Sequence, residues 1–145
     1  MLEIFPHMPL AHELKGWCTG MKGDWKKAAQ IFEENHRLFV KDPLKGLFQM
    51  GCAYGQAGEK EKAMKCIHLT EQRQLNEPGI VLDADLAMMW LSMGEVDKGF
   101  HHLFECVDKR MGPVAMIINH PMFKVPVDDA RYGMLKKRMG LSGYA

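Results

Sequence analysis

Equivalent residues recur along this chain at a nearly constant spacing, and this ladder restricts the fold more than any other feature. Five sets of three residues each keep successive separations of 35 and 36 positions. The sets are Gly16, Gly51 and Ala87; Thr19, Tyr54 and Trp90; Gly23, Gly58 and Gly94; Ala28, Ala63 and Gly99; and Phe32, Ile67 and Leu103. Such a period indicates stacked structural repeats, because one unit of that length cannot bury its own apolar face.

Each set is interpretable as part of a helix pair. Gly23, Gly58 and Gly94 each follow an apolar stretch and precede an acidic residue, the order expected where one helix ends and the next begins. The small residues let two helix axes approach, and the large ones fill the space beside them. The predicted helices cover residues 8–21 and 24–40, 44–56 and 59–74, and 80–93 and 95–110. No segment alternates apolar and polar residues for long enough to predict a strand, so the expected fold class is all-α.

The composition excludes several classes of protein. Hydrophobic residues make up 47% of the 145 positions, charged residues 26%, and the net charge is +1. A balance this close to neutral argues against a nucleic-acid or anionic membrane surface. No apolar run approaches the roughly 20 residues of a transmembrane helix, and the start lacks the regions of a signal peptide. A cytoplasmic location is therefore expected.

The chain contains four cysteines, and no two of them form a CxxC pair: Cys18, Cys52, Cys66 and Cys106. In a reducing compartment they are expected to be free thiols. We expect them to serve as small buried fillers, with a reactive thiol as the alternative.

The ladder resembles the tetratricopeptide repeat family over about residues 8–110. The segment Gly23–Phe32, which is followed by Asp42-Pro43, carries the family's G-x-x-x-x-A-x-x-x-F order, and Gly51–Ala63 repeats much of it. In the third unit Gly99 stands where the family usually has Ala. The resemblance implies three helix-turn-helix repeats, about 8–42, 43–78 and 79–112, in a right-handed solenoid that forms a single domain with a cap over 113–145.

The last thirty residues resemble the terminal cap of many bacterial tetratricopeptide proteins. The resemblance rests on the pattern P-x-F … D-x-R-Y … L-x-x-x-x-G-L between Pro121 and Leu141. In that family such modules are attached to nucleotide cyclases, protein kinases or transcriptional regulators. We expect Asp128 to cap a final helix that ends at Gly140, with Phe123, Tyr132 and Leu135 covering the last repeat.

The resemblance also implies a concave groove, lined by the first helix of each pair, that binds a partner. The residues of this chain at those positions include Leu10, Glu13, Trp17, Met21, Lys45, Phe48, Cys52, Gln56, Met88 and Leu91. Exposed apolar members would suit an amphipathic helix or an apolar peptide. The alternative is that some of them pack against neighbouring helices or against a longer parent protein.

One family subtype does not fit this groove. Modules that clamp a C-terminal carboxylate use Lys, Asn and Arg at set positions, where this chain has Glu13, Trp17, Gln49, Val81 and Asp85. Neutral or acidic residues cannot neutralise a peptide terminus, so binding of chaperone tails is not expected.

The sequence gives little indication of metal binding, catalysis or phosphate binding. Adjacent residues of a helix point about 100° apart, so His101 and His102 cannot chelate one metal from one face, and His101 with Glu105 supplies only two ligands. No nucleophile motif or phosphate-binding glycine loop is present. The basic run Lys136–Arg138 is most simply a solvated last turn of a helix. The sequence therefore predicts no enzyme activity, no cofactor and no metal.

The resulting hypothesis is a non-catalytic scaffold that binds a protein or peptide segment, possibly from its own parent chain. It would be the C-terminal module of a bacterial signalling or transcription-regulatory protein. The alternative is a self-associating module, a homodimer for example. We also expect Met1 to begin a piece of a longer protein, because Leu2, Ile4 and Phe5 would otherwise be exposed.

Overall fold

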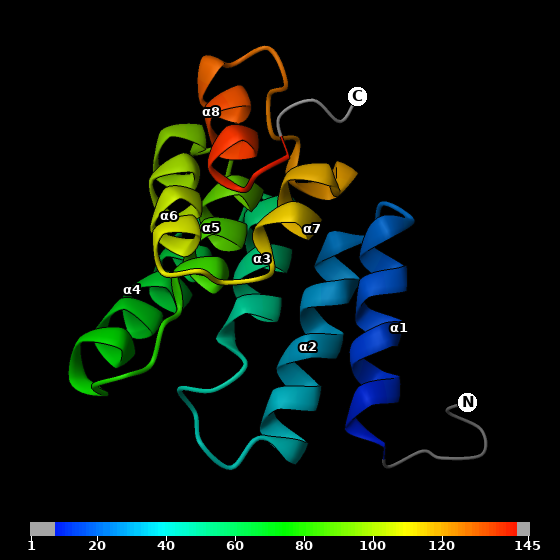
Figure 1. Cartoon of the computed structure of the whole chain (residues 1–145). Helices are drawn as coiled ribbons and strands as arrows, with labels where there is room; N and C mark the ends of the chain where they lie inside the picture. The colour runs from blue at the N-terminus through cyan, green and yellow to red at the C-terminus, as the bar shows by residue number, and fades with distance from the viewer. Residues whose placement is uncertain (1–7, 142–145) are drawn as a thin grey trace.

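The computed structural model describes residues 8–141, apart from the side chain of Phe39, and this part of the chain is all-α, without strands (Figure 1). Its eight α-helices and one short 3-10 turn are α1 (Pro9–Met21), α2 (Trp25–Phe39), α3 (Leu47–Ala57), α4 (Lys60–Asn76), α5 (Asp83–Ser92), α6 (Val96–Asp108), α7 (Val114–Asn119), η1 (Pro121–Phe123) and α8 (Ala130–Arg138). Within these ranges, none of the helices combines the length and the apolar character needed to span a membrane. The expectation for Leu2, Ile4 and Phe5 lies outside the described residues.

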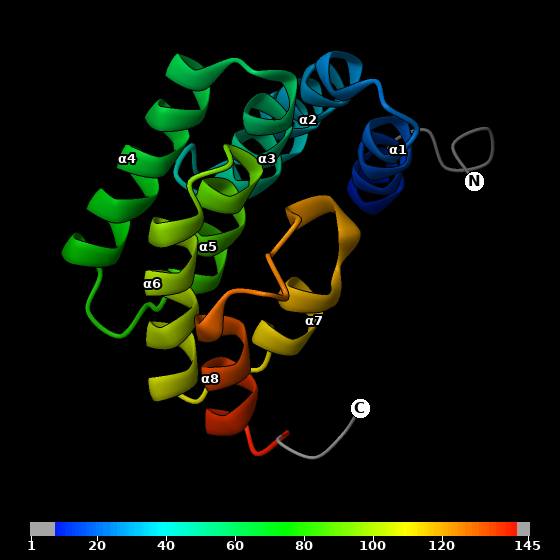
Figure 2. The same ribbon diagram turned by 90° about the horizontal axis from the view of Figure 1, so that it is seen from above.

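Consecutive helices pack as pairs. α1 packs against α2, α3 against α4 and α5 against α6, and neighbouring pairs meet mainly through α2–α3 and α3–α5. Seen from above, α1, α3 and α5 lie on the inner side of an arc and α2, α4 and α6 on its outer side (Figure 2). The all-α prediction and the six paired helices are thus confirmed, although α3 and α5 each begin three residues later than predicted.

The glycines between paired helices end the first helix of each pair, as predicted. Gly23, Gly58 and Gly94 have φ angles of 102°, 79° and 80°, in the left-handed region that favours glycine. The backbone N–H of each following acidic residue bonds a carbonyl five positions earlier, at Thr19, Tyr54 and Trp90. These acceptors are themselves one set of the ladder, so the same turn recurs at the spacing of the ladder.

The remaining sets form the core between paired helices. A Cβ atom added to Gly16 would lie 2.5 Å from the ring of Phe32 on the paired helix. One added to Gly51 would collide first with the side chain of Met89 on α5, in the next pair, and would lie 3.2 Å from Cβ of Cys66 on its own partner helix. Ala28, Ala63 and Ala87 are fully buried, as are Ile67 and Leu103, while Phe32 is 2% exposed. Each large side chain contributes about 1.5–3 kcal/mol by leaving water, so these contacts hold the short helices in pairs.

The C-terminal segment, residues 113–123, folds back onto the inner side of the arc. It comprises α7 and η1, and η1 packs against α5 while α8, further on, packs against α6. Phe123 and Leu135 are buried and Tyr132 is half-buried, consistent with the predicted capping role. The guanidinium of Arg131 lies 4.5 Å from the ring centre of Phe100 and bonds Asp97 and Asp129, which fixes α8 in place.

One detail of the cap differs from the prediction. The residue that caps α8 is Asp129, whose Oδ1 accepts the Arg131 N–H at 2.9 Å, and not Asp128, which is exposed. A turn closed by the bond from Asp129 N to Pro126 O places Asp128 one residue before the helix boundary. Gly140, with a φ of 74°, lies directly after the end of the helix, as predicted.

Candidate binding groove

An apolar groove of about 390 Å³ lies on the inner side of the arc, between α1 and the C-terminal segment. Its lining comes from α1 (Trp17, Met21), α3 (Phe48), α5 (Ala84, Asp85, Met88) and the C-terminal segment (Pro113, Met116, His120, Met122, Phe123). All but two of these side chains are apolar. The chain thus supplies one wall of the groove from its own C-terminal part.

Trp17, which lines the groove from α1, packs against three other aromatic rings. Its ring lies 4.9 Å from that of Phe32, 6.5 Å from that of Trp25 and 6.3 Å from that of Phe48, measured between centroids. Trp25 reaches this cluster because Gly20 has no side chain and the Trp25 ring packs over it. Trp17 is consequently a fixed surface, whereas Met21, one turn further and 50% exposed, is free to adapt.

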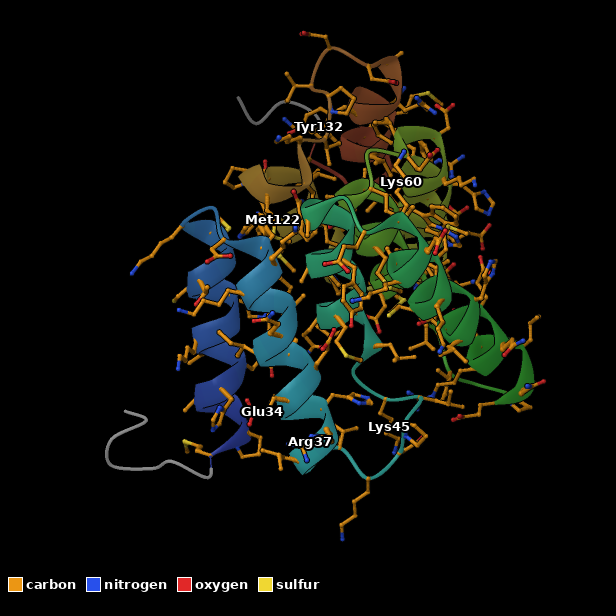
Figure 3. The ribbon with its side chains drawn as sticks, turned by 180° about the vertical axis from the view of Figure 1, so that it is seen from behind. Glu34, Arg37, Lys45, Lys60, Met122 and Tyr132 are labelled. Atoms are coloured by element: carbon orange, nitrogen blue, oxygen red, sulfur yellow. The ribbon has the colours of Figure 1, made fainter. Side chains whose placement is uncertain are left out.

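The opposite wall is fastened by polar contacts. Gln56 Nε2 donates to the carbonyl of Met122 at 2.8 Å, and Figure 3 shows Met122 beside the end of α3 that carries Gln56. His120 Nδ1 accepts the backbone N–H of Met122 at 3.2 Å, and its ring lies 5.6 Å from that of Phe123. Because Nδ1 of His120 accepts this hydrogen bond, the neutral imidazole carries its proton at Nε2.

Asp85 is the acidic group of the groove. It stands in the first turn of α5 among apolar neighbours, and burial raises the pKa of its carboxyl to about 6, an effect that the charge of Arg73 partly offsets. Arg73 is itself engaged, with Glu77 at 3.0 Å and the Leu44 carbonyl at 3.3 Å. Within residues 8–141 the Asp85 carboxylate makes no hydrogen bond or ion pair.

Four of the predicted groove residues come together here: Trp17, Met21, Phe48 and Met88. Gln56 is beside the groove through its bond to Met122. Leu10, 55% exposed, and Glu13, which accepts from Gln49 Nε2 at 3.1 Å, lie further back along α1 and outside the lining.

Three predicted residues are placed elsewhere. Cys52 is fully buried between helices. Leu91 is 4% exposed because its side chain packs over Gly99, so that a Cβ there would lie 2.5 Å from it. Lys45 precedes α3, since Gly46 adopts a left-handed conformation and the helix begins only at Leu47; it lies at the end of the molecule opposite Met122 (Figure 3).

Sequence reasoning missed Asp85 as a groove residue and missed the whole C-terminal wall. In the sequence, Asp85 was noted only because it occupies a position where modules that bind a C-terminal carboxylate have Lys, Asn or Arg. For the wall, the apolar run over 113–118 was the signal available in the sequence, but it does not show that this segment turns back toward α1.

Asp83, the neighbouring carboxylate on α5, is engaged in structure, unlike Asp85. Asp83, 2% exposed, accepts from His102 Nδ1 at 2.9 Å and from Lys109 Nζ at 2.7 Å. Its burial raises the pKa, but the bonds from Lys109 and His102 outweigh this and lower it. Among the described residues, no group of three or more His, Cys, Asp and Glu side chains is arranged to hold a metal ion.

Three cysteines are buried and one is not. Burial raises the pKa of Cys52 and Cys106 to about 12 and that of Cys66 to about 11, which keeps these thiols protonated at neutral pH. Cys18 is exposed, so the expectation that all four are buried was wrong for this residue.

Comparisons of the chain with protein-family models, with curated proteins and with solved structures give no match. The arrangement of helix pairs and the groove itself are therefore the basis for any statement about function.

Proposed function

We propose that this chain is a non-catalytic protein-interaction module that binds an apolar segment of a partner protein in the groove between α1, α5 and the C-terminal segment. The observation that carries the proposal is the lining itself. Trp17, Phe48 and several methionines surround a hollow of about 390 Å³, within the range of typical ligand sites. Methionine side chains adapt to different apolar surfaces, which is useful at a site that binds peptides.

The proposal includes a tetratricopeptide-type fold with three repeats in a right-handed solenoid. It is supported by the recurring ladder, by the pairing of consecutive helices and by the packing of α3 against α5, the first helices of adjacent pairs. In such a solenoid the inner helices offer the binding surface. The pattern between Pro121 and Leu141 supports a place at the C-terminal end of a bacterial signalling or regulatory protein.

The experiment uses substitutions at exposed methionines, which leave the core intact. Met21→Glu and Met116→Glu place a charge in the groove, and Met134→Glu on α8 is the control, since Met134 and Met116 are both 52% exposed. Twelve-residue segments are selected from a displayed library on the wild-type protein and then tested on the three variants. The proposal requires segments that lose binding to Met21→Glu and Met116→Glu and keep it to Met134→Glu. A selection without such segments refutes it.

A second candidate function is self-association, favoured by one observation. Met8, directly before α1, and Leu10 and Leu14 in its first half are 39%, 55% and 44% exposed and add apolar surface outside the groove. Light scattering over a range of protein concentrations tests this. A strict monomer at high concentration excludes it, and a dimer that Leu14→Glu dissociates supports it.

A further inference from the structure

We infer that the groove selects segments in which a lysine or arginine stands among apolar residues, with its cation paired to the carboxylate of Asp85. This inference rests on the proposed function and specifies its partner.

The first argument is the position of Asp85. Its carboxylate lines the groove in the first turn of α5, next to Ala84 and Met88, and no hydrogen-bond donor or cation of residues 8–141 contacts it. A carboxylate among apolar side chains lacks part of the hydration it would have in water. A cation that enters the groove restores a charge partner and is attracted more strongly than at an open surface.

The second argument is the distribution of charge around Asp85. The basic side chain whose charge acts on Asp85 is Arg73 of α4, which is occupied by Glu77 and the Leu44 carbonyl. The buried thiols of Cys52 on α3 and Cys106 on α6, on which the charge of Asp85 acts, are protonated and neutral, and His120 also lines the groove. The lining contains no lysine or arginine, so an incoming cation meets one carboxylate and no competitor within the groove.

The third argument is the chemistry of the remaining lining. The rings of Trp17, Phe48 and Phe123 offer negative faces that attract cations, and the apolar surfaces around them fit the aliphatic stem of lysine or arginine. Met21 of α1 and Met116 of the C-terminal segment extend the apolar lining beyond the immediate surroundings of Asp85. That extension favours a peptide side chain with apolar neighbours over a free small cation, whose binding would use the carboxylate alone.

The test builds on the selection described above. Segments whose binding depends on Met21 and Met116 are sequenced after selection on the wild type and, in parallel, on Asp85→Asn. The inference requires enrichment of lysine or arginine at one position on the wild type and loss of that enrichment on Asp85→Asn. Asp128→Asn, at an exposed aspartate of the cap, is the matched control and should leave the enrichment unchanged.

A thermodynamic cycle then tests the pair directly. One selected segment is synthesised with its lysine and with norleucine in that position, and both are titrated into wild type and Asp85→Asn. We expect the change of lysine to norleucine in the segment to weaken binding to the wild type about tenfold, and Asp85→Asn to weaken binding of the lysine segment by a similar factor. The two changes together should weaken binding little more than either one alone. Spermidine is titrated as the free cation; competition by spermidine at concentrations comparable with the segment would overturn the choice of a peptide side chain.

The outcomes separate the two proposals. If the selected segments bind Met21→Glu and Met116→Glu as well as they bind the wild type, the proposed function is refuted, and this inference with it. Segments that depend on those methionines but show no basic preference, or bind Asp85→Asn as well as wild type, leave the proposed function standing and overturn the inference alone.

Discussion

Replacing Asp85 with asparagine should make the protein more stable at neutral pH. The pKa of the folded-state carboxyl is raised from 3.8 to about 6, chiefly by burial, so ionisation of Asp85 opposes folding. About two powers of ten in proton affinity, each worth about 1.4 kcal/mol, set an upper limit of about 3 kcal/mol. The groove admits water, and asparagine loses the favourable interaction of a carboxylate with the start of α5, which together reduce the expected gain to about 1–2 kcal/mol.

The pH dependence of this gain follows from the direction of the shift. Because the folded state holds the Asp85 proton more tightly than the unfolded state, the contribution of Asp85 to the stability of the wild type falls as pH rises from about 4 to about 6 and is level above that. The asparagine side chain of the variant carries no titrating proton. The advantage of Asp85→Asn is therefore smallest at pH 4, grows through pH 6 and is constant from about pH 7.

Urea unfolding of both proteins at pH 4, 5, 6, 7 and 8 measures this difference. Asp128→Asn serves as the control, because its side chain is exposed and the substitution should change stability little at any of these pH values. A difference of zero at pH 7, or one that does not change with pH, refutes the reasoning that burial of the Asp85 charge destabilises the fold.

Three other predictions concern packing, a buried ion pair and thiol reactivity. Gly16→Ala should cost about 1–3 kcal/mol in urea unfolding, because its Cβ meets the Phe32 ring, whereas Gly133→Ala, with open space around it in α8, should gain about 0.5–1 kcal/mol; equal effects would contradict the close packing at Gly16. Asp83→Asn should cost about 2 kcal/mol at pH 7, and since the pKa of Asp83 is lowered in the folded state, the wild-type advantage should disappear as pH falls below about 4; a loss that persists there would exclude the ion pair as its cause. Ellman's reagent should modify one thiol of the folded protein rapidly, that of Cys18, and the other three only on unfolding; rapid reaction in a Cys18→Ser variant would show that a buried thiol is accessible.

The helix pairs could be predicted because their signals are local. A glycine followed by an acidic residue reflects a left-handed backbone at Gly23, Gly58 and Gly94, and the alternation of small and large residues reflects contact between adjacent helices. Both recur in every unit, so three imperfect copies reinforce one another. The boundaries at Leu47 and Asp83 were less accurate because the loops before them vary in length between units.

The groove could be predicted only in part. Trp17, Met21, Phe48 and Met88 follow from the period, but all residues of α5 except Asp85 are buried, so helical periodicity cannot separate a groove face from a core face there. Leu91 and Asp85 were misjudged for that reason. The C-terminal wall depends on contacts such as Gln56 to Met122, 66 positions apart, which no local pattern encodes.

The attachment of α1 has a mechanical consequence for the groove. Within the described chain, α1 packs most extensively against α2. That pair joins the rest through α2–α3, where the Tyr54 hydroxyl donates to Glu33, and through the contacts of Trp17 with Phe48 and of Gln49 with Glu13. A small rotation of the first pair about that junction would move Trp17 and Met21 away from Met116 while α3 to α8 keep their packing. The width of the opening thus depends on the contacts between the first helix pair and α3, and bulkier segments require adjustment there.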